Sequence, residues 1–244
     1  MTRTCLKGVL WDMDGTIVDT EPYWFRAEAQ LMSQWNVPWT EQDSMRLVGS
    51  ALPVYAHVAQ SAGVALSTRE IIEQLLNSVI SQTREAIPWR PGARELLAQL
   101  RQAGIPMGLV TMSEAGLANE IVSQLPADTF CVQVTGELVA QGKPAPDPYL
   151  LGARLLGEQA FVGETVDLRQ IIAIEDSEPG VASALAAGLT TVGVPNIVAL
   201  QPQPGLTLWP TLTGATIADL ETLLAARQVE SEALDSSNAM KLSL

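Results

Sequence analysis

Two carboxylates separated by one residue stand near the start of the chain. Asp12 and Asp14 follow the apolar run Val9–Trp11, which predicts a buried strand, and Gly15 comes directly after them. Glycine turns the chain at no steric cost, so both carboxylates can converge on one point. Two carboxylates at such a short distance repel each other unless a cation or a shared proton offsets the charge. Carboxylate oxygens are hard ligands, which favour Mg²⁺. Taken alone, such a pair is more often a solvated turn.

Polar residues also gather at three later points of the chain. Each group stands at the end of an apolar run or before a helical pattern: Thr111–Ser113, Lys143–Pro144 and Glu175–Ser177. Ligands of open α/β sheets bind outside the carboxyl ends of the strands, so these groups are expected to meet the first acidic pair. Acids for a metal and a nucleophile, with a hydroxyl group and a lysine for phosphate oxygens, suit Mg²⁺-assisted phosphoryl transfer.

Each of these residues has a simpler interpretation when it is considered alone. Thr111 or Ser113 would cap a helix, Ser177 is expected to cap the next one, and Lys143 would be solvated. Their occurrence in order at successive strand ends is what favours a catalytic site.

The elements that must position these groups follow from hydrophobic periodicity. The expected strands are Leu6–Trp11, Pro106–Val110, Phe130–Val134, Ile171–Ile174 and Thr190–Val194. Helical patterns begin at Glu21, at Thr40 and at the Ser67/Glu70 capping box, and cover Val54–Gln60, Gly92–Ala103, Glu114–Leu125, Asp147–Leu156 and Pro179–Ala187. We expect loops at Gly157–Gln170 and Gln201–Gly214.

This order predicts an α/β fold with a Rossmann-like doubly wound parallel sheet and an all-helical insertion after the first strand. The core would comprise residues 1–19 and 89–228, the helical cap residues 20–88, and a disordered tail residues 229–244. The chain would cross between the two parts near Val18–Pro22 and Ile87–Pro91.

Composition excludes several classes of function. The formal net charge is −13, which argues against binding to nucleic acid or to anionic membranes. No run of about 18 apolar residues predicts a membrane span, and the first residues lack the apolar segment of a signal peptide. Cys5 and Cys131 are expected to be buried free thiols, which fits a reducing cytoplasm.

The four motifs together resemble those of the haloacid dehalogenase-like hydrolase superfamily. They are Asp12-Met13-Asp14-Gly15-Thr16, Thr111, Lys143-Pro144 and Glu175-Asp176-Ser177-Glu178-Pro179-Gly180, within a similarity that extends from about Leu6 to Pro195. The helical insertion resembles the C1 cap of that superfamily. The most similar subgroup is the β-phosphoglucomutase-like one, which includes sugar-phosphate phosphatases.

The resemblance implies a function for each acid. Asp12 would be the nucleophile that forms an aspartyl-phosphate, and Asp14 would protonate the leaving alcohol and then activate water. Asp12, the backbone carbonyl of Asp14 and Asp176 would bind Mg²⁺, with Glu175 at or near the metal. The implied activity is Mg²⁺-dependent hydrolysis of small phosphate esters, such as sugar phosphates, by a monomeric cytoplasmic enzyme.

The same resemblance assigns Thr111, Met112 and Lys143 to the phosphate group of the substrate. In the cap, the candidates for contact with the substrate are Thr20, Glu21, Trp24, Gly49 and Ser50. Trp24 could equally belong to the apolar core.

Two other functions stay open at this point. In the phosphosugar mutases a histidine aligns with Trp24 and an arginine lies near Leu52, and this chain has neither, which favours hydrolysis. A non-catalytic scaffold is disfavoured because acids packed together without a metal would cost stability.

Overall fold

The computed structural model describes residues 6–48 and 50–228. Within them one parallel sheet has the strand order β3-β2-β1-β4-β5-β6. The strands are β1 (Gly8–Trp11), β2 (Met107–Val110), β3 (Val132–Val134), β4 (Ile171–Glu175), β5 (Thr190–Gly193) and β6 (Leu206–Leu208). This is the order of the doubly wound Rossmann fold, and it places β1 in the middle of the sheet. The predicted fold class is confirmed.

The central strands form because both of their faces are covered by apolar side chains. Leu10 of β1 pairs with Gly108 of β2 on one side and with Ala173 of β4 on the other. Every residue of these three strands is buried. Their near-continuous apolar sequence is therefore typical of parallel strands with helices on both sides.

Alternation along β1 directs side chains into two separate apolar clusters. Val9 and Trp11 pack in one cluster with α5 (Ala93–Gln102) and α6 (Ala115–Val122). Leu10 packs in the other cluster with α7 (Asp147–Ala160) and α8 (Glu178–Ala186). Short 3₁₀ turns occupy Gly136–Leu138 and Leu168–Gln170, and residues 217–228 form a further helix. The two clusters hold the strands rigidly between helical layers.

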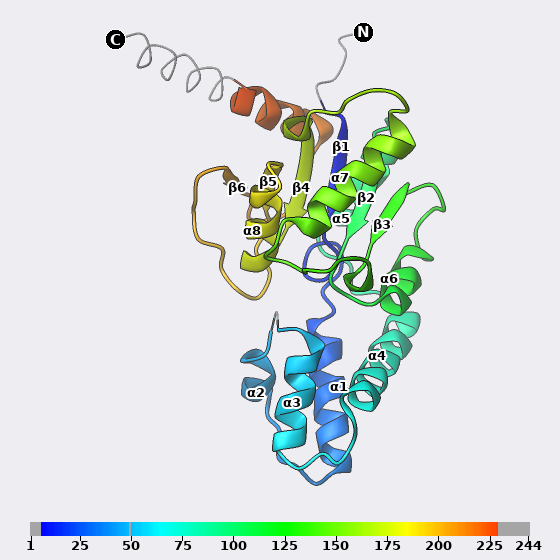
Figure 1. Cartoon of the computed structure of the whole chain (residues 1–244), viewed down its shortest axis with the longest axis vertical. Helices are drawn as coiled ribbons and strands as arrows, with labels where there is room; N and C mark the ends of the chain where they lie inside the picture. Colours follow the sequence, from blue (N-terminus) through cyan, green and yellow to red (C-terminus); the bar gives the residue numbers. More distant parts are fainter. Residues whose placement is uncertain (1–5, 49, 229–244) are drawn as a thin grey trace.

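A helical segment lies between β1 and α5 and forms the lower lobe in Figure 1. It contains α1 (Glu21–Gln34), α2 (Glu41–Met45), α3 (Leu52–Ser61) and α4 (Thr68–Glu85). The expected capping boxes are present: Thr40 with Asp43 begins α2, and Ser67 with Glu70 begins α4. The insertion after the first strand is therefore confirmed, whereas its limits at 20 and 88 stay a prediction.

The chain enters and leaves this segment through two extended stretches that pair with each other. The backbone N–H of Asp19 donates to the carbonyl of Pro88 at 2.8 Å, and that of Arg90 donates to the carbonyl of Ile17 at 2.9 Å. Val18 and Trp89 form an antiparallel bridge between these bonds. The helical segment is thus joined to the sheet by adjacent strands, and the sheet directs its carboxyl edge toward it (Figure 1).

Three expectations from the sequence are wrong in detail. Strand β6 lies inside the stretch expected to be a loop, because three residues after Gly205 are too few to show alternation. Helix α7 continues past Gly157 to Ala160, where an Arg154–Glu158 ion pair of 2.7 Å spans one helical turn.

Cys131 is the third error, because it is exposed rather than buried. It directly precedes β3, the edge strand on that side of the sheet. Cys5, Gly49 and the tail 229–244 lie outside the described residues. None of the helices in residues 6–48 and 50–228 has the length and hydropathy that crossing a bilayer requires.

Candidate active site

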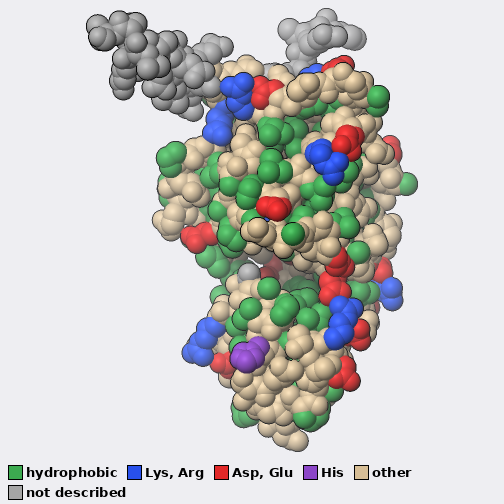
Figure 2. All heavy atoms as spheres, viewed as in Figure 1, with side chains coloured by type: hydrophobic (Ala, Val, Ile, Leu, Met, Phe, Trp, Pro, Cys, Tyr) green, Lys and Arg blue, Asp and Glu red, His purple; other side chains and the backbone are tan. Residues whose placement is uncertain are grey.

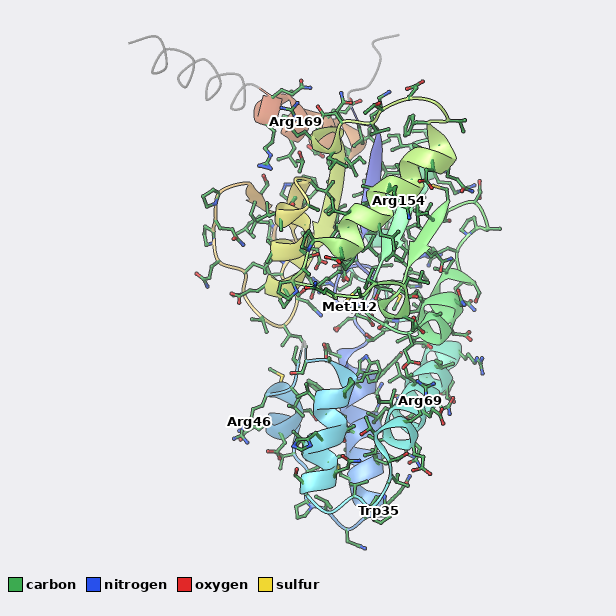
Figure 3. The ribbon with its side chains drawn as sticks, in the orientation of Figure 1. Trp35, Arg46, Arg69, Met112, Arg154 and Arg169 are labelled. Carbon is green, nitrogen blue, oxygen red and sulfur yellow. The ribbon has the colours of Figure 1, made fainter. Side chains whose placement is uncertain are left out.

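The carboxyl ends of β1, β2 and β4 bring the predicted polar residues together. Asp12 and Asp14 follow β1, Thr111 follows β2, and Glu175 ends β4. The surface is hollowed between the sheet lobe and the helical lobe (Figure 2), and Met112 lies at this junction (Figure 3). The site is therefore at the switch point of the sheet, where such folds bind ligands.

Lys143 is the buried cation of the site. Its Nζ donates to Asp12 Oδ1 at 2.7 Å, to Glu175 Oε1 at 2.6 Å and to the carbonyl of Val110 at 2.9 Å. Burial opposes the charged ammonium, but the charges of Asp12 and Glu175 outweigh it and raise the pKa of Lys143. The ammonium group therefore stays charged and ties the ends of three strands together.

Asp12 has one carboxylate oxygen that the described residues leave without a partner. Its Oδ1 accepts from Lys143, whereas the buried Oδ2 has no hydrogen-bond donor among them. Burial and the nearby charge of Glu175 raise the pKa of Asp12 to about 7, although Lys143 acts in the opposite direction. An unpartnered, buried carboxylate oxygen is costly, and a cation or an electrophile would compensate it.

Three hydroxyl groups surround the carboxylate of Asp14. Thr20 donates to Oδ1 at 2.5 Å, Ser113 donates to Oδ2 at 2.6 Å, and Thr111 is 3.5 Å from Oδ2. Burial raises the pKa of Asp14, and the hydrogen bonds from Ser113 and Thr20 partly offset that shift. A raised pKa favours the protonated form of Asp14, which is the form that a general acid needs.

Two glycines leave room for the other two acids. A β-carbon on Gly15, where φ is +89°, would collide with the Asp176 carboxylate, and one on Gly180 would collide with that of Glu175. Thr16 Oγ1 donates to Asp176 Oδ1 at 3.3 Å, and Ser177 caps α8 as expected. Burial and the charge of Asp12 raise the pKa of Asp176 well above its ordinary value.

The acid cluster has a donor set that fits a hard metal ion. Oxygen atoms of Asp12, Glu175 and Asp176 lie within 4.8 Å of one another. Among the described residues, four acids at this edge face one buried cation, and burial together with repulsion between the acids raises the pKa values of Asp12 and Asp176. The free Oδ2 of Asp12 and the all-oxygen donor set fit a divalent cation of the Mg²⁺ type.

The residues of the helical segment that were expected to contact the substrate differ in how deeply they are buried. Thr20 is buried against Asp14, and Glu21 is close enough for the Asp14 charge to act on it. Burial and that charge raise the pKa of Glu21 to about 7. Trp24 is half-buried and packs against the apolar core, and Ser50 is exposed before α3.

Sequence reasoning missed two side chains of this site. Ser113 belongs to the polar group expected after the second strand, but no role at the site was predicted for its own side chain; α6 has no side-chain cap, and Ser113 bonds to Asp14. Its position two residues after Thr111 at a strand end was the available signal. Tyr149 donates its hydroxyl hydrogen to Glu175 Oε1 at 2.7 Å. A tyrosine within an apolar helix face gives no sequence signal of such a bond.

The sequence is similar to a family of hydrolases and to individual phosphatases. A sequence profile described as haloacid dehalogenase-like hydrolase matches residues 6–188. Hexitol phosphatase A of Escherichia coli (strain K12) is 34% identical over 190 residues, which are 77% of this chain and 82% of that protein. N-acetylmuramic acid 6-phosphate phosphatase of Pseudomonas aeruginosa is 32% identical over 199 residues, 80% of this chain and 84% of the relative.

Solved structures agree on the fold. The crystal structure of CbbY from Rhodobacter sphaeroides in complex with phosphate has a TM-score of 0.76 at 24% identity, covering 87% of this chain and 98% of that one. The β-phosphoglucomutase of Clostridium difficile has a TM-score of 0.75 at 20% identity, covering 92% and 99%. With its motifs, its inserted helices and these similarities, the chain belongs to the haloacid dehalogenase-like hydrolase family.

Proposed function

We propose that this protein is a phosphatase that hydrolyses small phosphorylated metabolites, with sugar and sugar-alcohol phosphates as its substrate class. The observation that carries the proposal is the free Oδ2 of buried Asp12 beside Lys143, with a second acid, Asp14, held by hydroxyl groups. The named activities of relatives such as hexitol phosphatase A support it.

The reaction follows from the placement of the two acids. A carboxylate oxygen of Asp12 attacks the phosphorus atom, the bond from phosphorus to the ester oxygen breaks, and the leaving alcohol takes a proton from Asp14. Asp14, now ionised, removes a proton from a water molecule, whose oxygen attacks the aspartyl-phosphate. Inorganic phosphate leaves, and Asp12 is restored as a carboxylate. The raised pKa of Asp14 favours the protonated form that the first of these transfers uses.

The acids of the site repel a phosphate group, so positive charge and hydroxyl groups are needed to bind it. Lys143 neutralises phosphate oxygens, and Thr111 with the backbone at Met112 completes the cradle at the end of β2. Asp12, Asp176, the backbone carbonyl of Asp14 and Glu175 would hold Mg²⁺. When bound, the metal supplies the positive charge that offsets repulsion between the phosphate and these acids.

The helical segment would contact the rest of the substrate. Thr20 and Glu21, at the start of α1, lie close to Asp14, whereas Trp24 packs against the apolar core and Ser50 precedes α3. A carboxylate such as Glu21 accepts hydrogen bonds from sugar hydroxyl groups. Closure of the segment would exclude water while the aspartyl-phosphate forms.

A phosphate-release screen tests the proposal. The purified protein is incubated with hexose, pentose and hexitol phosphates, with Mg²⁺ or with EDTA, and released phosphate is measured. We expect turnover that EDTA abolishes and that Asp12→Asn removes. Full activity of Asp12→Asn would refute the assignment of Asp12 as the nucleophile. Transfer of labelled phosphate to a second position of the sugar, instead of to water, would indicate a mutase.

A further inference from the structure

Lys143 has no hydrogen left for a substrate. An ammonium group has three donors, and those of Lys143 go to Asp12, Glu175 and the carbonyl of Val110, at 2.6–2.9 Å. A phosphate group that binds to Lys143 must therefore replace one of these three acceptors. The replaced acceptor is buried, so it needs another donor or it becomes an unsatisfied polar group.

Of the two carboxylates that Lys143 binds, Glu175 is the better supplied with other donors. Tyr149 donates to the same Oε1 at 2.7 Å, and the backbone N–H of Asp176 and the hydroxyl of Ser177 donate to Oε2 at 3.3 and 3.2 Å. Asp12, in contrast, has an Oδ2 without any donor among the described residues. Loss of the hydrogen bond from Lys143 is therefore less costly for Glu175 than for Asp12, provided that the bond from Tyr149 remains.

We propose that Tyr149 is a positioning residue that holds Glu175 while Lys143 transfers one hydrogen bond from Glu175 to the phosphate group of the substrate. This inference rests on the proposed function, because it assigns Lys143 to phosphate. Tyr149 acts through Glu175 and touches neither the substrate nor the reacting atoms.

The surroundings of Tyr149 suit this task. The side chain is fully buried in α7, and its ring lies 5.1 Å from Lys143 Nζ, where the ring face attracts the ammonium group. Burial and the charge of Glu175 raise the pKa of Tyr149 well above its ordinary value, so its hydroxyl remains a donor. The ring of Tyr149 thus attracts the Lys143 ammonium group, while its hydroxyl holds the Glu175 carboxylate.

Removal of one hydroxyl group tests the inference, with a second buried tyrosine as the matched control. Tyr149→Phe leaves Glu175 dependent on Lys143, so the lysine is released less readily to phosphate. Titration calorimetry with inorganic phosphate in the presence of Mg²⁺ should show roughly tenfold weaker binding, from the loss of one hydrogen bond to a charged group. Tyr55→Phe removes a buried hydroxyl that has no partner among the described residues, and should leave phosphate affinity unchanged.

Two results separate this inference from its alternatives. If Tyr149→Phe lowers the melting temperature but binds phosphate as tightly as the wild type, Tyr149 only stabilises the fold and the inference is overturned. If Tyr149→Phe does not fold, Tyr149→Met removes the hydroxyl together with the ring, and Tyr55→Met is then its matched control. Weaker phosphate binding without any turnover on the ester panel would contradict the proposed reaction and leave this inference standing. A wild-type protein that binds no phosphate would contradict both.

Discussion

Replacement of Lys143 by methionine should destabilise the metal-free protein strongly. The side chain of Lys143 is 5% exposed, and its two acidic partners, Asp12 and Glu175, are 9% and 0% exposed. Removing one member of a buried ion pair leaves an uncompensated charge, which costs about 3–5 kcal/mol. For a chain of this size, a loss of about 1 kcal/mol lowers the melting temperature by about 2–4 °C, so the expected decrease is about 6–20 °C.

Differential scanning calorimetry at pH 7 in EDTA measures this effect. Lys7→Met is the matched control, because Lys7 is 34% exposed and its ion pair with Glu164 spans 3.8 Å. Exposed pairs of this kind contribute about 0–1 kcal/mol, so the control should melt within a few degrees of the wild type. At pH 5 the defect of Lys143→Met should shrink, because Asp12, whose pKa is about 7, is then protonated.

The double variant Lys143→Met/Glu175→Gln should recover part of the loss, since it removes a charge from each side of the pair. The reasoning would be refuted if Lys143→Met melted within about 2 °C of the wild type, or if its defect were the same at pH 5 and pH 7. Either result would mean that Lys143 does not compensate the buried acids.

Three further predictions concern other groups of the structure. Because the pKa values of Asp12 and Glu21 rise to about 7 on folding, the folded chain retains protons that the unfolded chain releases between about pH 4 and 7. The melting temperature in EDTA should therefore fall from pH 5 to pH 8, and an increase would contradict this. Ser113→Ala removes a 2.6 Å bond that favours ionised Asp14, so the alkaline limb of kcat/KM against pH should move to higher pH. An unchanged alkaline limb would show that the Ser113 hydrogen bond does not affect the pKa of Asp14. Tyr55→Phe should melt at the same or a higher temperature in calorimetry, because its buried hydroxyl has no partner among the described residues, and a clear decrease would reveal one.

Much of the framework could be predicted because its signals are local. Apolar runs such as Ile171–Ile174 and the capping box at Ser67 depend only on neighbouring residues, and the structure has both. The acids could be assigned to one site because parallel strands end at a common edge. Strand β6, in contrast, is defined by pairing with β5 and not by its own three residues.

The finer parts of the site depend on contacts that are distant in sequence. Ser113 reaches Asp14 across 99 residues, and Tyr149 reaches Glu175 across 26. Neither residue lies in a recognisable sequence motif, so its hydrogen-bond partner is known only from the folded structure. The same holds for Cys131, whose exposure is decided by the edge position of β3.

The paired stretches at Ile17–Asp19 and Pro88–Arg90 give the helical segment a modular character. Its two ends leave the sheet side by side, bonded to each other through the backbone. A different insert could therefore be grafted between them, or a short turn could replace the segment, without rerouting any strand. The catalytic edge of the sheet and the helical segment can thus change separately, because only these two backbone connections join them.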